Sequence, residues 1–445
     1  MDYGIWVQLI ATMGLIPNVT NLGLTYSMVR FFPSMKNHKK EIQEAFYSIF
    51  FVVLIVSILV SLGFLLSSKT ISILFGNNIV ITLILPFILL FTSLNFVFLN
   101  FFRTFQQMRM YSLFMLLQSY INLIIAAYLV ISGYSIIYVV IGVLITQILI
   151  FILMGLLLIK EIGIKVPKFR NMKDYLSFGV PTIPTTLSFW IVDSSDRYVI
   201  SILLGTAFVG YYSPGYTLGN LIQRIVVPFA VILPSLLSPY HDKNEINEIK
   251  IFLKYSLKYF LALGIPAVFG LSVLSKQILL ILTTPEIAIQ GYLITPFVAL
   301  GALFFGIYGI FSQIFILEKE TKIVGLIWII ASISNLILNI LLVPYFGFLG
   351  AAIVTLFAYL FVMISVIISS FKYLRFDRNI QFIVKSTFAS AVMAGFIIGL
   401  NPMGIISIIL TILISIIIYI VILLILRGIT KQEIELFMSY FKSNP

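Results

Sequence analysis

The stretch from Ile405 to Leu426 reads IISIILTILISIIIYIVILLIL and contains no charged residue. At a rise of about 1.5 Å per residue, a helix of this length crosses a hydrocarbon core that is about 30 Å thick. The backbone of such a segment must be helical, because lipid offers no hydrogen-bond partner to its N–H and C=O groups. This run therefore predicts a membrane-spanning helix, and similar runs fill most of the chain.

The composition of the whole chain supports the same interpretation. Hydrophobic residues make up 61% of its 445 positions and charged residues only 10%, whereas a soluble globular protein carries about 25% charged residues. The chain has no Cys and only two His, His38 and His241, so a disulfide framework, a Cys nucleophile or a histidine-based metal site is not expected. No P-loop pattern occurs, and we expect no bound cofactor.

Long apolar runs separated by short polar segments predict an all-α polytopic membrane protein with about 13 transmembrane helices. The predicted spans are residues 4–29, 45–67, 79–102, 111–131, 135–159, 175–204, 207–238, 255–275, 288–316, 323–343, 347–371, 381–400 and 405–426. In a soluble protein the net charge of +12 would indicate a nucleic-acid partner. Here we expect no nucleic acid, and the charges have to be placed relative to the membrane.

Basic residues follow alternate spans. Of the 28 Lys and Arg residues, all but Lys69, Lys276, Arg197 and Arg224 lie in or beside the loops after the odd-numbered spans. The positive-inside rule places these loops in the cytoplasm. We therefore expect a multi-pass protein of the cell (cytoplasmic) membrane, with its visible N-terminus outside and its C-terminus in the cytoplasm.

The chain repeats itself at a shift of 213 residues. The segment from Tyr120 to Val130 aligns with the segment from Ile333 to Val343, and Asn122 coincides with Asn335. The four spans within 45–159 match the four within 255–371, so the halves are predicted to be parallel repeats, as in many transporters.

The span 175–204 has no mate in the first half. This predicts two parallel six-helix lobes, with the first helix of the N-lobe missing, plus two C-terminal helices; a natural thirteen-span variant is the alternative. The predicted organisation is an N-lobe at 1–160 with five visible spans, a cytoplasmic linker at 161–174, a C-lobe at 175–371 with six spans, and two extra spans with a cytoplasmic tail at 372–445.

Short motifs in both halves carry a family resemblance. The motifs are Tyr3-Gly4-Ile5-Trp6, Leu22-Gly23-Leu24 and Val29-Arg30-Phe31 in the first half, and Asp196-Arg197-Tyr198, Leu204-Gly205 and Val209-Gly210-Tyr211-Tyr212 in the second. Together they resemble polysaccharide repeat-unit flippases. These proteins belong to the multidrug/oligosaccharidyl-lipid/polysaccharide exporter superfamily, whose members have twelve or fourteen helices in two six-helix lobes around a central cavity.

The resemblance implies a flippase that translocates lipid-diphosphate-linked oligosaccharide repeat units across the cytoplasmic membrane by alternating access, for polysaccharide or glycan biosynthesis. The implied substrate is a polyprenyl- or dolichyl-diphosphate oligosaccharide in the lipid bilayer; glycan assembly enzymes are candidate partners, and a monomer is expected. An ion-coupled multidrug exporter of the same superfamily is the alternative. A membrane-embedded glycosyltransferase or polymerase is less favoured, because the predicted external loops are short and nearly free of charge, so we expect no enzyme and no catalytic residue.

Charged residues inside apolar spans are the strongest site candidates, since each costs about 2.5–3.5 kcal/mol at a helix centre. Asp193, Asp196 and Arg197 fall within one face of the span 175–204, with Arg197 roughly 12 Å below the predicted outer end. Arg224 lies roughly 20 Å past Tyr211 along its span.

The functional interpretation is that Arg197 and Arg224 hold the pyrophosphate of the substrate through charge-assisted hydrogen bonds. Asp193 or Asp196 would tune Arg197 or take a coupling proton or sodium ion. The alternative is that Asp193 and Arg197 neutralise each other at i, i+4 and only stabilise the helix.

Three further residues are weaker candidates for substrate binding. Gln223 and Asn335 lie within spans, where an amide could bond sugar hydroxyls, although hydrogen bonding between helices is favoured for any single residue. Arg30 ends the first span on the predicted cytoplasmic side, where it would be an early contact for an inner-leaflet substrate or simply an anchor at the membrane surface.

Overall fold

The computed structural model describes residues 1–35 and 38–428, and the regular secondary structure in this part of the chain is all helical. The predicted cytoplasmic tail after Gly428 lies outside the described residues. The chain divides into two compact units, Met1–Gly210 and Tyr211–Pro445, which we call unit 1 and unit 2 and describe separately. The helix α10 (Thr206–Asn220) contains the division between them.

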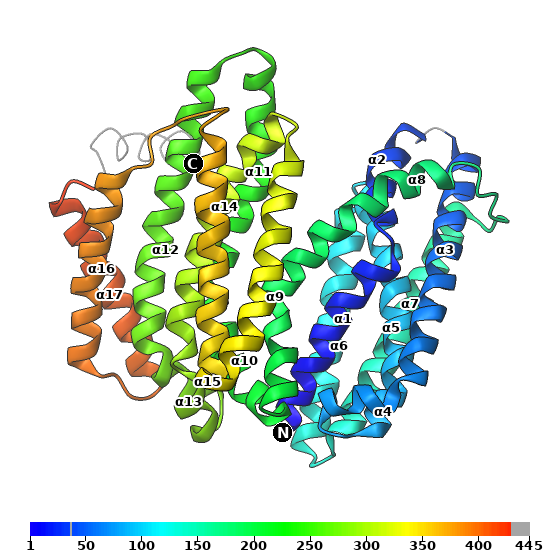
Figure 1. The fold of residues 1–445 in the computed structure, drawn as a ribbon, viewed down its shortest axis with the longest axis horizontal. Coiled ribbons are helices and arrows are strands. Elements are labelled where there is room, and N and C mark those ends of the chain that lie inside the picture. Colours follow the sequence, from blue (N-terminus) through cyan, green and yellow to red (C-terminus); the bar gives the residue numbers. More distant parts are fainter. Residues whose placement is uncertain (36–37, 429–445) are drawn as a thin grey trace. The chain divides into compact units, whose positions relative to one another are not determined.

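The described residues of unit 1 form nine α-helices and three 3-10 turns before α10 (Figure 1). They are α1 (Asp2–Thr20), α2 (Leu24–Phe31), η1 (Phe32–Met35), α3 (Lys39–Leu66), α4 (Ser68–Ile71), η2 (Ser72–Phe75), α5 (Ile79–Thr104), α6 (Met108–Ile131), α7 (Ile136–Ile162), α8 (Met172–Gly179), η3 (Val180–Thr182) and α9 (Ile183–Leu203). Helix α5 packs against α1, α3 and α7, and it is apolar over most of its surface because it is the central helix of the unit.

Unit 2 contains longer helices after α10. They are α11 (Gln223–Asp242), α12 (Ile246–Leu282), α13 (Pro285–Gly291), α14 (Ile294–Leu317), α15 (Thr321–Ser370), α16 (Ile380–Leu400) and α17 (Ile405–Ile425). Helix α14 packs against α11, α12 and α15, as α5 packs against α1, α3 and α7 in unit 1. The packing order of the first unit thus recurs in the second.

Ten helices in the described part of the chain are long and apolar enough to cross a membrane, or eleven if the bent pair α1–α2 counts as one span. The bounds of α6, α7, α16 and α17 lie within a few residues of the predicted spans. Two predicted spans, 323–343 and 347–371, are joined in α15, where Gly347 has the non-helical angles φ 61° and ψ −156°. The predicted count of 13 therefore stays a prediction.

The predicted span 175–204 is interrupted. It consists of α8, η3 and α9, and Pro181 and Pro184 stand at the interruption, where proline removes backbone donors. Helix α9 is not among the ten apolar helices, because its polar residues lower its hydropathy. Contacts group α8 and α9 with unit 1, whereas the repeat assigns residues 175–204 to the C-lobe.

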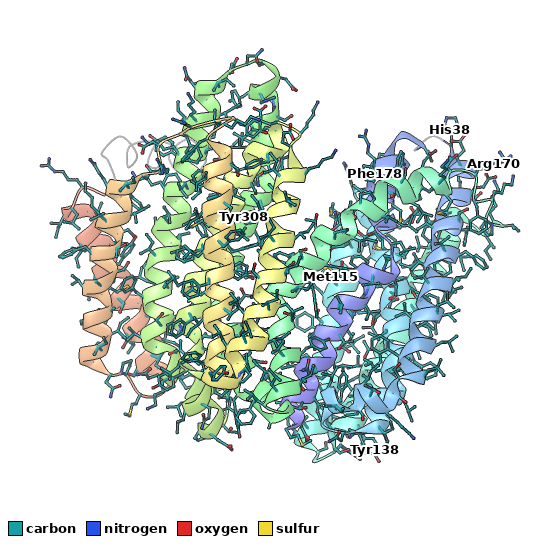
Figure 2. All side chains as sticks on the ribbon, viewed as in Figure 1. His38, Met115, Tyr138, Arg170, Phe178 and Tyr308 are labelled. Atoms are coloured by element: carbon teal, nitrogen blue, oxygen red, sulfur yellow. The ribbon has the colours of Figure 1, made fainter. Side chains whose placement is uncertain are left out.

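Loops that are predicted to share one side of the membrane share one end of unit 1. The side chains of His38, before α3, and Arg170, before α8, lie at one end of the helices (Figure 2). Tyr138, near the start of α7, lies at the opposite end (Figure 2). This arrangement agrees with the alternation of basic loops in the sequence, while the orientation of the unit in a bilayer stays a prediction.

Candidate functional site

Two broken helices of unit 1 meet at a pair of glycines. Helices α1 and α2 are bent by 59° at the break between Thr20 and Leu24. Gly23 in this break has φ +69°, and a Cβ added to it would lie 2.0 Å from the carbonyl oxygen of Gly179, the last residue of α8. Only glycine allows both this angle and this approach, so the sequence permits α2 and α8 to cross backbone to backbone.

The predicted charge cluster lies one helix further along, in the middle of α9. The Arg197 guanidinium donates from Nη1 to the carbonyl of Asp193 at 2.9 Å, and the same atom lies 3.4 Å from the Asp196 carboxylate. The Arg197 side chain is 11% exposed and the Asp196 side chain is fully buried. The Asp196 Oδ1 atom also accepts the backbone N–H of Arg197 at 2.8 Å. The structure therefore brings all three predicted residues into one turn.

Helix α1 contacts the Arg197 turn through two hydrogen bonds. The Gln8 amide donates to the backbone carbonyl of Arg197 at 2.8 Å, and the Thr12 hydroxyl lies 2.7 Å from the hydroxyl of Tyr198. Gln8 and Thr12 are both buried, and Thr12 donates its own proton to the carbonyl of Gln8 at 2.7 Å. The Tyr198 hydroxyl must then be the donor to Thr12. Trp190 packs beside Tyr198 with ring centroids 5.5 Å apart.

In unit 2, the second predicted arginine lies on a different kind of surface. Arg224 is exposed near the start of α11, and the described residues hold no carboxylate that pairs with it. The neighbouring Gln223 points to the interior of the unit instead and donates to the Tyr359 hydroxyl at 3.2 Å. The buried face of α11, which contains Val226 and Leu233, lies on the side away from Arg224.

An apolar cavity of about 490 Å³ in unit 2 lies beside the break between α10 and α11. Its walls come from that break and from α12, α16 and α17, and nearly all of the lining side chains are apolar. Ile222 and Ile225 line the cavity and flank Arg224 in sequence. The hydroxyl of Tyr419, which also lines it, is bonded to Ser386 and to the carbonyl of Ala262. A cavity of this kind suits a hydrocarbon chain.

The other two candidates lie elsewhere. Asn335 is buried in α15, where its side-chain oxygen accepts from the Asn339 amide at 3.1 Å. This is the bonding expected of a polar group within a helix bundle. Arg30 is exposed in the last turn of α2. Neither placement tests substrate binding, so both roles stay predictions.

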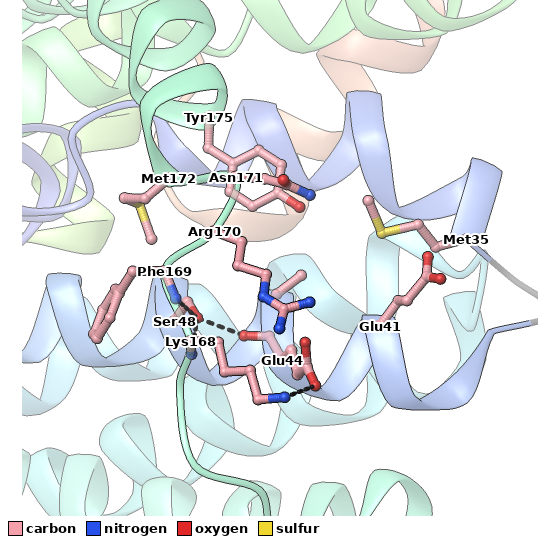
Figure 3. Close-up of a pocket in the computed structure, with 11 residues that line it drawn as sticks. Met35, Glu41, Glu44, Ser48, Lys168, Phe169, Arg170, Asn171, Met172 and Tyr175 are labelled. Atoms are coloured by element: carbon pink, nitrogen blue, oxygen red, sulfur yellow. Dashed lines mark hydrogen bonds and ion pairs between the residues drawn. The ribbon is translucent and has the colours of Figure 1, made fainter.

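A polar pocket of about 320 Å³ lies where the segment between α7 and α8 crosses the start of α3 (Figure 3). The Ser48 hydroxyl accepts the backbone N–H groups of Lys168 and Phe169 at 3.2 and 3.1 Å. The Glu44 carboxylate pairs with Lys165 at 2.7 Å and with Lys168 at 3.1 Å. These groups hold the segment against α3, so this part of the predicted linker is attached to unit 1.

The described residues contain no group of three or more His, Cys, Asp or Glu side chains that could hold a metal ion. At the Arg197 turn the groups present are the Arg197 guanidinium, the Asp196 carboxylate and the hydrogen-bonding groups around them. Gln8 and Thr12 were not among the sequence candidates, although a signal existed, because two polar residues at i, i+4 in an apolar run mark one helix face. The apolar cavity had no signal of its own, because its walls come from segments far apart in sequence.

Two protein families match this chain. Residues 1–238 match the family described as polysaccharide biosynthesis protein, and residues 181–341 match the family described as MatE. The probable low-salt glycan biosynthesis flippase Agl15 of Haloferax volcanii is 25% identical over 243 residues, which cover 54% of this chain and 51% of that protein. The chain thus spans about half the length of this relative.

Solved structures show where the fold recurs. The lipid II flippase MurJ in an inward closed conformation matches with a TM-score of 0.79 and 23% identity, over 94% of this chain and 92% of that chain. An inward-facing multidrug resistance MATE family transporter matches with a TM-score of 0.69 and 14% identity, over 83% of this chain and 92% of that chain. At these identities the likeness shows a shared helical fold.

The resemblance inferred from the short motifs is confirmed by the family match, which covers residues 1–238 of 445. This protein belongs to the polysaccharide biosynthesis protein family, within the multidrug/oligosaccharidyl-lipid/polysaccharide exporter superfamily.

Proposed function

We propose that this protein is a flippase that moves lipid-diphosphate-linked oligosaccharide repeat units across the cytoplasmic membrane, for polysaccharide or glycan biosynthesis. The observation that carries this proposal is the Arg197 turn of α9. A guanidinium that is 11% exposed sits in the middle of a broken helix, in a chain of the polysaccharide biosynthesis protein family. Such a cation suits the diphosphate that all lipid-linked sugar carriers of this type share.

An amphipathic substrate needs an apolar site as well as a cationic one. In unit 2 the exposed Arg224 lies between two residues whose side chains line the apolar cavity. We infer that Arg224 contacts the diphosphate while the cavity holds a short stretch of the polyisoprenoid chain. The helices α16 and α17 would then serve to enclose the lipid, because both contribute to the cavity wall.

The remaining features of the proposal follow from the same residues. Asp193 or Asp196 would take a coupling proton or sodium ion, because both carboxyl groups lie in the turn that carries Arg197. Gln223, Asn335 and Arg30 stay weaker candidates for contacts with the sugar or with an incoming head group. We propose further that the C-terminus lies in the cytoplasm, that transport proceeds by alternating access of the two halves, and that no catalytic step is involved.

The alternative is an ion-coupled multidrug exporter, which the MatE match over residues 181–341 keeps open. Exporters of cationic drugs need an anionic binding surface, whereas Arg224 and Arg30 are exposed cations and the Asp196 carboxylate is fully buried beside Arg197. This favours the anionic lipid carrier as substrate.

Transport of a fluorescent polyprenyl-diphosphate disaccharide into proteoliposomes tests the proposal. Arg197→Ala and Arg224→Ala should each reduce the initial rate at least about tenfold, because a charge-assisted bond contributes about 1.5–3 kcal/mol. Arg375→Ala is the matched control, since this arginine lies over the ring of Phe371 in the loop after α15 and should keep the wild-type rate. Wild-type rates in both test variants, or faster transport of ethidium than of the lipid-linked sugar, would contradict the proposal.

A further inference from the structure

The segment from α8 to the start of α10 contacts α1 and the α1–α2 break at several points. Near the start of α1, a Cβ added to Gly4 would lie 2.0 Å from the carbonyl oxygen of Thr206, just after α9. Just after the end of α1, Gly23 lies against the backbone of Gly179 in α8. Between these two close approaches, Gln8 and Thr12 bond to successive residues of α9. The two segments therefore run antiparallel and in contact, as Figure 1 also shows for α1 and α9.

The two polar bonds meet α9 at the turn that carries the substrate-binding candidate. The Gln8 amide reaches the carbonyl of Arg197, and the Thr12 hydroxyl reaches the side chain of the next residue, Tyr198. On its other side, Arg197 is held through its guanidinium by the carbonyl of Asp193 and the carboxylate of Asp196. The backbone of this residue is thus held from α1, and its side chain from α9 itself.

Resting on the function proposed above, we propose that Gln8 and Thr12 are positioning residues for Arg197. They fix the rotation and the depth of the Arg197 turn relative to α1, so that the guanidinium faces the diphosphate of the substrate. Both side chains are buried, with exposed fractions of 0% for Gln8 and 4% for Thr12, so neither is itself placed to bind a substrate. Hydrogen bonds suit this task because they are directional and are lost when one helix slides or rotates against the other.

This proposal also explains why α9 groups with unit 1. The sequence repeat makes α9 the first helix of the second half, yet its hydrogen bonds to α1 lie within unit 1. Arg197 is then carried by the first unit.

The test measures equilibrium binding of the fluorescent polyprenyl-diphosphate disaccharide to the full-length protein in detergent. Gln8→Met and Thr12→Val keep the shape of each side chain and remove its hydrogen bond. Each should weaken binding about tenfold, because the Arg197 turn loses one of its two bonds to α1. Thr12→Ser keeps the hydroxyl and should restore binding to within about twofold of wild type, which separates the hydrogen bond from a packing effect.

Asn95→Leu is the matched structural control. Asn95 is a buried amide of the same unit that joins α5 to α7, donating to the backbone carbonyl of Gln147 at 2.9 Å and to its side chain at 2.8 Å. Its replacement should lower the melting temperature as much as Gln8→Met does but leave the affinity within about twofold, because Asn95 has no bond to α9.

A double substitution separates positioning from general destabilisation. If Gln8 acts through Arg197, then Gln8→Met should weaken binding less than about twofold when Arg197 is already Ala. An equal loss of affinity in both backgrounds, or wild-type affinity in folded Gln8→Met and Thr12→Val, would overturn the positioning role while leaving the proposed function intact. Wild-type affinity in the single variant Arg197→Ala would also overturn the positioning role, and wild-type affinity in both Arg197→Ala and Arg224→Ala would overturn the proposed function as well. If Gln8→Met does not fold, the comparison of Thr12→Val with Thr12→Ser decides.

Discussion

The crossing of α2 and α8 at Gly23 gives a stability prediction whose parts can be measured separately. Replacing Gly23 by Ala adds a Cβ 2.0 Å from the carbonyl oxygen of Gly179 and forces a non-glycine residue to φ +69°. The left-handed conformation costs about 1–2 kcal/mol and the overlap about 1–3 kcal/mol. We therefore expect Gly23→Ala to destabilise unit 1 by about 2–5 kcal/mol in total.

Two other glycines isolate the two costs. Gly133, in the turn between α6 and α7, has φ +78°, and an added Cβ would meet no described atom within 4 Å, so Gly133→Ala measures the conformational cost alone. Gly179 has the ordinary φ of −76°, and an added Cβ would lie 2.7 Å from the carbonyl carbon of Gly23, so Gly179→Ala measures the overlap alone. The loss in Gly23→Ala should approach the sum of the other two.

Thermal unfolding in detergent, followed by the fluorescence of Trp6 in α1 and Trp190 in α9 in a Trp328→Phe background, reports on this unit. For a cooperative unit that ends at Gly210, 1 kcal/mol corresponds to about 2–4 °C. The melting temperature of Gly23→Ala should thus fall by about 4–20 °C, and by about 2–12 °C more than that of Gly133→Ala. Equal shifts in these two variants, or no shift in Gly179→Ala, would refute the close backbone crossing.

Three further predictions concern other parts of the chain. Ala267→Phe places a ring in the apolar cavity of unit 2 and should slow transport of the lipid-linked sugar severalfold in proteoliposomes. The control Val231→Phe, on the exposed face of α11, should keep the wild-type rate. Equal transport rates in the two variants would argue against lipid in the cavity. The hydrogen bond from Lys254 lowers the pKa of Asp377. The contribution of this pair to the free energy of unfolding should be full above the ordinary Asp pKa of 3.8 and be lost as the pH falls through the lowered pKa. Acid titration of the melting temperature should be flatter in Asp377→Asn, and an unchanged curve would contradict this assignment. Gly347→Ala should lower the melting temperature by more than Gly133→Ala, because only glycine readily adopts φ 61° with ψ −156°. A smaller drop would mean that the conformation of Gly347 does not fix the kink in α15.

The positions of most spans could be predicted from the sequence because lipid imposes one secondary structure on any long apolar run. Helix α17 ends within one residue of the predicted span 405–426, and α16 begins one residue before the predicted span 381–400. Both are bounded by residues that interrupt a helix, such as Gly404 with φ +81° and Asn401 with φ +41°. Hydropathy and these boundaries are local properties, so one sequence is enough to read them.

The bend within the first predicted span could not be predicted from hydropathy. Hydropathy predicts a single run over 4–29, because the residues on both sides of Gly23 are apolar, and it does not reveal that the helix bends by 59° there. By contrast, the boundary predicted between 323–343 and 347–371 coincides with the kink at Gly347, where two helices meet within α15. The direction of the chain at such points depends on what packs against it, and this is a tertiary property.

The candidate site could be predicted only in part for the same reason. The spacing of Asp193, Asp196 and Arg197 on one helix face is a local pattern, and the structure places them in one turn. Their contact with Gln8 joins residues 189 positions apart, which periodicity along the chain does not encode. The charges within a predicted membrane span therefore identified the Arg197 turn. The contacts of Gln8 and Thr12 with this turn could be recognised only in the three-dimensional structure.

The repeat places different chemistry at equivalent positions of the two units. At the shift of 213 residues, Asn95 of α5 corresponds to Tyr308 of α14. In unit 1 Asn95 joins α5 to α7 through two bonds to Gln147, whereas in unit 2 Tyr308 packs against Phe305 and Trp328 with ring centroids 5.5 and 5.4 Å apart. An amide pair fixes one arrangement of its helices through directional bonds, and a ring cluster does so through shape. Because the common backbone is stabilised by different forces in each half, a substitution in one unit does not predict the effect of its counterpart in the other.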